Sequence, residues 1–217
     1  MPEAGSLTVL GVAAAFFLAG SAAGYWIFAL CAREPRTELP GSWRLPMATV
    51  TGMFCTLLVV RFGLQPVLAP LLVLAVFGVL LGSIDLHTRL LPNRIMLPFL
   101  GVSSAALLLS TIADQRWPAL LAALAGSAAL FTVYLLLALI SPASMGMGDV
   151  KLAGVLGLHA GFAGVAAWTA TLLGGFVLGA AGGILVLALK RGDRKAHFPF
   201  GPGMVAAALA GTLLYAS

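Results

Sequence analysis

Residues 118–140 read PALLAALAGSAALFTVYLLLALI, an apolar run without a charged side chain. A helix needs about 20 such residues to cross the hydrocarbon core of a bilayer. The whole chain of 217 residues shares this character, because 61% of its residues are hydrophobic and 9% are charged. An ordinary soluble domain has about 25% charged residues. Strand-like alternation is absent, so the sequence predicts an all-α, polytopic membrane helix bundle.

Pro residues and charges divide the chain into about eight transmembrane helices. The predicted spans are 7–31, 46–63, 66–84, 95–112, 118–140, 150–160, 162–189 and 200–216. Residues 150–189 as one helix would be about 60 Å long, roughly twice the hydrocarbon thickness. We therefore predict a break near His159-Ala160-Gly161.

The distribution of cations supports eight crossings. With the break, the loops on one side hold ten of the 12 Lys and Arg residues, and the opposite loops hold Arg61 and Arg116. Without the break, these residues divide evenly. The positive-inside rule then predicts both termini outside and the loops 32–45, 85–94, 141–151 and 190–198 in the cytoplasm.

Charge and cysteine content exclude several classes of function. The net charge of +5 lies in short loops and reports membrane orientation. No basic stretch is interleaved with aromatic residues, so nucleic-acid binding has no support. Cys31 and Cys55 lack CxxC partners and histidines at ligand spacing. The sequence therefore predicts no metal site, and it leaves the oligomeric state open.

Two carboxylates stand apart from the others, because each adjoins a long apolar span. Asp85 follows the run that ends at Ile84, and Asp149 begins the helix that continues with Val150. Ionisable groups at such positions are costly and are candidates for function. The other five carboxylates lie in tails or loops, where a solvated role suffices: Glu3, Glu34, Glu38, Asp114 and Asp193.

The predicted topology places Asp85 and Asp149 at the same membrane edge, where they can meet in the folded bundle. Paired carboxylates are the machinery of aspartic proteases, in which one takes a proton from water and the other polarises the scissile carbonyl. Asp149 lies at a helix N-terminus, which favours the anion, and Asp85 lies at a C-terminus. We therefore hypothesise that Asp149 is more often the ionised partner.

Three segments resemble the motifs of one family. Gly146-Met147-Gly148-Asp149-Val150-Lys151-Leu152 resembles the GxGDxKL motif of the type IV prepilin peptidases, which are GxGD membrane aspartic proteases. The stretch from Asp85 through Arg89 to Leu91-Pro92-Asn93 is similar to the other aspartate motif of that family. Pro199-Phe200-Gly201-Pro202-Gly203 resembles its PFGP segment. The resemblance covers residues 46–216, and it implies a catalytic membrane domain over 46–217 after a first helix and loop over 1–45.

The resemblance implies an aspartic endopeptidase with Asp85 and Asp149 as its catalytic pair. It also implies an active-site loop formed by Gly146, Gly148, Lys151, Arg89, Pro92 and Asn93. Such enzymes need no cofactor, and they remove the basic leader of prepilin-like or pseudopilin-like proteins at the cytoplasmic face of the bacterial inner membrane. Their partners are these substrates and the membrane lipids.

One departure separates this chain from the larger, bifunctional members of the family. Those members carry paired zinc-binding CxxC motifs between their first two helices, whereas residues 32–45 have no CxxC. The segment Trp43-Arg44-Leu45-Pro46 still resembles the stretch on the C-terminal side of the zinc segment in those members. We therefore expect a shortened member with peptidase activity and without N-methyltransferase activity.

Three other functions remain open from the residues alone. A presenilin-like protease that cleaves within the bilayer would share the GxGD motif but not the Leu-Pro-Asn and PFGP segments. A small transporter could use paired acids, although transporter sites tend to lie near the midplane. A catalytically silent subunit of a secretion machine is the third. The cations Arg89 and Lys151 are also explained by membrane anchoring.

Overall fold

The computed structural model describes residues 3–31, 39–141, 145–188 and 199–216. These residues form eight α-helices and one short 3-10 helix, and they contain no strand. The helices are α1 (Glu3–Cys31), η1 (Gly41–Trp43), α2 (Arg44–Phe62), α3 (Leu68–Thr88), α4 (Asn93–Asp114), α5 (Trp117–Ile140), α6 (Met147–Ala163), α7 (Val165–Ala188) and α8 (Gly201–Tyr215). The predicted all-α membrane bundle is confirmed.

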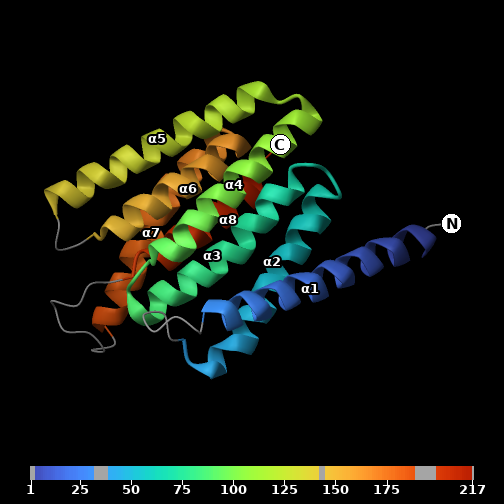
Figure 1. Cartoon of the computed structure of the whole chain (residues 1–217), viewed down its shortest axis with the longest axis horizontal. Helices are drawn as coiled ribbons and strands as arrows, with labels where there is room; N and C mark the ends of the chain where they lie inside the picture. The colour runs from blue at the N-terminus through green and yellow to red at the C-terminus, as the bar shows by residue number, and fades with distance from the viewer. Residues whose placement is uncertain (1–2, 32–38, 142–144, 189–198, 217) are drawn as a thin grey trace.

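Three helix pairs make the most extensive contacts: α1 with α2, α5 with α6, and α7 with α8. Helix α3 lies inside the bundle and packs against α2, α4 and α8 (Figure 1). The C-terminal end of α3 and the N-terminal ends of α4, α6 and α8 gather at one end of the bundle (Figure 1). This end carries the three sequence motifs.

Six of the described helices are long and apolar enough to cross a membrane, and α8 is a shorter apolar helix. The chain is therefore a multi-pass membrane protein. Helix α6 differs from the others because residues 152–163 are buried without interruption. At 1.5 Å per residue its 17 residues span about 25 Å. Surrounded by protein, α6 forms the centre of the bundle.

The break between α6 and α7 lies later than the sequence predicts. It falls at Gly164, whose φ of 116° is a conformation that residues with a side chain rarely adopt. His159 stays inside α6 because its Nε2 pairs with Ser103 Oγ of α4 at 2.9 Å. Its ring also stacks on Phe99. The predicted break at His159-Ala160-Gly161 is thus wrong by a few residues, although the division into two helices is right.

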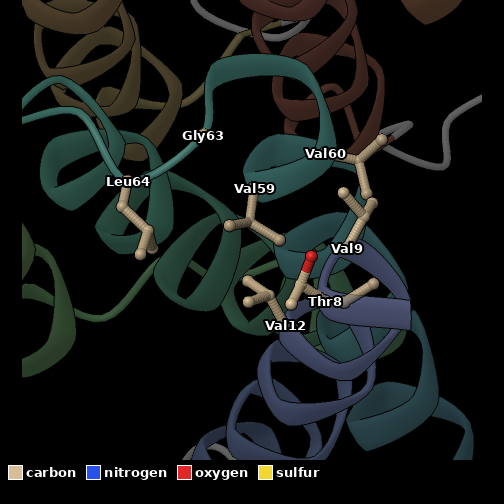
Figure 2. A pocket seen from close by; sticks show the side chains of 8 residues that line it. Thr8, Val9, Val12, Val59, Val60, Gly63 and Leu64 are labelled. Atoms are coloured by element: carbon tan, nitrogen blue, oxygen red, sulfur yellow. The ribbon is translucent and has the colours of Figure 1, made fainter. Parts of the chain in front are cut away.

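A cavity of about 270 Å³ lies between α1 and α2 (Figure 2). Its lining side chains come from Thr8, Val9, Val12, Ala13, Val59, Val60 and Leu64, together with Gly63. Leu64 follows the C-terminal end of α2, so this cavity is at the end of the bundle opposite the motifs. The lining offers no acid or base, and the candidate site therefore lies elsewhere.

Candidate active site

Asp85 is buried near the C-terminal end of α3, with only 4% of its surface exposed. Its Oδ2 accepts a hydrogen bond of 2.9 Å from the backbone N–H of Gly201. Gly201 is the first residue of α8, so the carboxylate lies at the positive end of that helix dipole. The C-terminal position on α3, which disfavours an anion, is therefore offset by α8.

Gly201 has to be glycine for this contact to exist. A Cβ on Gly201 would lie 2.7 Å from Asp85 Oδ2 and 3.1 Å from its Cγ. Both distances are shorter than van der Waals contact allows. The PFGP segment thus supplies a backbone donor with no side chain, and it fixes one oxygen of the buried carboxylate.

Asp149 is held by the start of its own helix. The backbone N–H of Gly146 donates to Asp149 Oδ2 at 3.1 Å, and the N–H of Asp149 donates to the carbonyl of Gly146 at 3.1 Å. The first bond is the half of a capping box that the N3 side chain supplies, and the second is a backbone turn bond, since Gly146 has no side chain. Asp149 is partly exposed, so water can reach it while Oδ2 stays fixed.

The structure places the two aspartates at the same end of the bundle, Asp85 near the end of α3 and Asp149 near the start of α6. The negative charge of Asp149 acts on the buried carboxyl group of Asp85. The positive charge of Arg89 acts on the same group from the C-cap of α3, where Arg89 adopts the left-handed conformation with φ 55°. Two carboxylates that repel one another favour a shared proton, which is the arrangement that acid and base roles require.

The other predicted loop residues join the two motifs to each other. Gly148 lies against Leu91, whose Cβ would be 2.8 Å from a Cβ at position 148. Lys151 Nζ donates to Asn93 Oδ1 at 2.8 Å. Pro92 is the N-cap residue of α4, and its carbonyl accepts the backbone N–H groups of residues 95 and 96. The segment that follows Asp85 is therefore clamped to the segment that carries Asp149.

Gly146 and Gly148 have different roles. A Cβ at position 146 would make ordinary contact at 3.6 Å, and the φ of Gly146 is −83°, which any residue adopts. The contribution of Gly146 is its backbone N–H, whereas Gly148 provides space for Leu91. Close approach of a neighbouring segment therefore requires glycine at position 148 and not at position 146.

A cavity of about 410 Å³ opens beside these residues, between α4, α5 and α6. Its polar lining comes from Asn93 and Lys151, and the rest is apolar: Met96, Leu97, Leu100, Phe131, Gly154 and Val155. Among the described residues, no group of three His, Cys, Asp or Glu side chains could hold a metal ion. Among the residues that the structure describes, the acids at this end of the bundle are Asp85 and Asp149.

Sequence reasoning missed two features of the site. It gave Gly201 no role, because only the packing of α8 on α3 shows that its N–H meets Asp85. It also passed over Tyr134 of α5, which is buried and feels the charge of Asp149. The only signal in the sequence was a tyrosine within an apolar span that also holds Ser127 and Thr132. The cations Arg33, Arg36, Lys190, Arg191, Arg194 and Lys195 lie outside the described residues.

The fold and the site place the chain in the class of multi-pass membrane proteins that carry two aspartates at one end of the helix bundle. Comparison with known proteins then gives the family. The sequence model of the type IV leader peptidase family matches residues 72–189, which include both Asp85 and Asp149. The chain belongs to this family, as the motifs predicted.

Curated relatives agree with this assignment. A prepilin leader peptidase/N-methyltransferase of Bacillus subtilis is 31% identical over 150 residues, which are 69% of this chain and 57% of the relative. One of Xanthomonas campestris is 32% identical over 178 residues, which are 81% of this chain and 60% of the relative. The chain thus spans about half the length of the curated relatives it matches. No solved structure matches it.

Proposed function

We propose that this protein is a membrane aspartic endopeptidase that removes the basic leader peptide of type IV prepilin-like proteins. The observation that carries the proposal is the geometry of the acids. Asp85 is buried and held by Gly201, and it lies within the electrostatic reach of Asp149 at the start of α6. Membership of the leader peptidase family supplies the substrate class.

The reaction needs only these two carboxyl groups and water. One carboxylate takes a proton from water, and the hydroxide attacks the carbonyl carbon of the scissile peptide bond. The protonated partner gives its proton to the carbonyl oxygen, which yields a tetrahedral diol. A proton then passes to the amide nitrogen, the C–N bond breaks, and the leader leaves with a new carboxyl group while the mature protein gains a free amine.

The position of the site suits a substrate with a basic leader and an apolar helix. The acids lie at the end of helices that cross the membrane, so a substrate helix in the bilayer would present its leader junction to them. The proposed location is the bacterial inner membrane, with the acids facing the cytoplasm. The positive-inside bias of the loops supports this orientation.

The proposed activity is hydrolysis without methylation. The basis is the segment 32–45, which has no CxxC motif. To test this, the purified protein in lipid is mixed with a prepilin-like substrate and a methyl donor. The mass of the cleaved product is then measured by mass spectrometry. We expect the mature protein with an unmodified amine. A product heavier by a methyl group would reject this part of the proposal.

The same assay separates the proposed function from its alternatives. A presenilin-like protease would cut within the apolar helix instead of at the leader junction, and the product masses would show it. Absence of cleavage by folded protein across several substrates would favour a transporter or a silent subunit. Ion flux in liposomes would then distinguish those two.

A further inference from the structure

Tyr134 on α5 is a buried phenol that the proposed mechanism does not use. Only 1% of its surface is exposed. Its ring stacks on Phe176 of α7 with 5.2 Å between the ring centres and 10° between the planes. A buried tyrosine usually finds a hydrogen-bond partner for its hydroxyl. In an apolar bundle, a polar group near that hydroxyl is therefore a candidate for its hydrogen-bond partner.

The register of α5 against α6 places Tyr134 level with Asp149. Ala122 of α5 contacts Gly161 of α6, and Gly126 contacts Gly157. Each step of four residues forward along α5 is thus matched by a step of four back along α6. Two further steps along the same faces bring Tyr134 opposite Asp149. This juxtaposition follows from backbone packing alone.

The space around the hydroxyl is provided by a glycine. A Cβ at Gly175 of α7 would lie 2.9 Å from the hydroxyl oxygen of Tyr134. The charge of Asp149 acts on this hydroxyl. The stack on Phe176 therefore fixes the ring of Tyr134, and its hydroxyl lies against Gly175.

We propose that Tyr134 is a positioning residue for Asp149, and this inference rests on the proposed peptidase function. Asp149 Oδ2 already accepts the N–H of Gly146. The hydroxyl of Tyr134 reaches the other oxygen across the attacking water, to which it donates. The carboxylate is then held at both oxygens, with one lone pair aimed at the proton of the water. Fixed donors of this kind raise the rate of the chemical step because they need no reorganisation during the reaction.

Replacing Tyr134 with Phe tests the inference, because the ring and its stack remain and only the hydroxyl is lost. We expect kcat for leader cleavage to fall about 10- to 100-fold, with KM unchanged, as is typical for loss of a hydrogen bond to a charged group. Gly175→Ala presses on the hydroxyl and should lower kcat in the same way. Tyr215→Phe, at the exposed C-terminal end of α8, is the matched control and should leave both constants unchanged.

The measurement also separates a structural role from a positioning role. A wild-type kcat for Tyr134→Phe would overturn the inference, and so would a raised KM at constant kcat. Infrared spectroscopy provides a readout that does not depend on activity. The Asp149 carboxyl band is identified as the band that is lost in the difference between wild type and Asp149→Asn. We expect this band to shift in Tyr134→Phe and not in Tyr215→Phe. If the wild type cleaves no leader, the proposed function fails, whereas an unshifted band rejects the role of Tyr134.

Discussion

Asp85 is oriented by a single backbone N–H from a residue 116 positions further along the chain. A carboxylate buried in apolar surroundings is costly unless donors and charges compensate it. Gly201 supplies the donor, and Arg89 supplies the compensating charge. The geometry of the candidate site therefore depends on how closely α8 approaches α3 at this one residue.

The Gly201→Ala variant should lose activity because its new Cβ would lie 2.7 Å from Asp85 Oδ2. We expect the carboxylate to be displaced, kcat to fall at least about tenfold, and the protein to lose about 1–3 kcal/mol of stability from overpacking. Gly82→Ala is the control, because its Cβ would make an ordinary contact of 3.6 Å with Pro202. Equal activity of both variants would contradict the role given to Gly201.

The hydrogen bond between Lys151 and Asn93 joins the two aspartate segments at 2.8 Å. We expect Lys151→Met and Asn93→Ala each to lower kcat/KM, and the double variant to lose little more than either single variant. A double-mutant cycle on kcat/KM should give a coupling of about 0.5–1 kcal/mol, since the pair is exposed. Additive losses would mean that the two side chains act separately.

Residue chemistry is enough to predict Asp85 and Asp149 as candidates, but not the groups that contact them. Asp85 and Asp149 are the two carboxylates that adjoin long apolar spans, and this rule needs only the sequence. The donor to Asp85 arises from packing of α8 on α3, and the register that we infer to place Tyr134 level with Asp149 arises from packing of α5 on α6. A single sequence records no distance between helices, so these contacts required the fold.

At the scale of elements, the seam between α5 and α6 holds the helix of Asp149 in place. Gly157→Ala would put a Cβ 2.6 Å from the carbonyl oxygen of Gly126 and force the two backbones apart. We expect a loss of about 1–3 kcal/mol in stability, measured as a lower thermal midpoint in detergent. Gly101→Ala on α4 has open space around its Cβ and should be at least as stable as the wild type. If Gly157→Ala were as stable as this control, close packing of α5 on α6 at Gly157 would not be needed for stability.

Helix boundaries show where sequence rules reach their limit. The predicted helix starts at residues 95 and 118 lie within two residues of Asn93 and Trp117, where α4 and α5 begin. For α5 the signal was Pro118, because proline is favoured in the first turn of a helix. The break between α6 and α7 was placed too early, because His159 and Gly161 look like a turn in sequence. Their contacts with Ser103 and Ala122 hold both residues in α6. Tertiary packing thus overrode a local signal.

At the scale of the whole molecule, membrane orientation remains the main prediction. In a cysteine-free background, Leu64→Cys lies at the end of α2 and Leu90→Cys lies beside the candidate site, and both positions are exposed. An impermeant thiol reagent added to intact cells should label Leu64→Cys and not Leu90→Cys. Inverted vesicles should give the opposite pattern. Labelling of Leu90→Cys in intact cells would reverse the proposed topology.

Composition and charge were enough to predict the bundle, because only helices satisfy their own backbone in such apolar runs. The gathering of three motifs at one end followed from alternating helix directions. The central place of α6 did not follow, since its 17 residues resemble any short apolar span. Its burial depends on the neighbours that surround it.

The central claim is that Asp85 and Asp149 cleave a leader peptide together. The most direct measurement is cleavage of a prepilin-like substrate by the purified protein in lipid, with Asp85→Asn, Asp149→Asn and the exposed control Asp114→Asn. We expect both site variants to lose at least about 1000-fold in kcat while remaining folded, and Asp114→Asn to match the wild type. Cleavage that survives either site variant would contradict the paired mechanism.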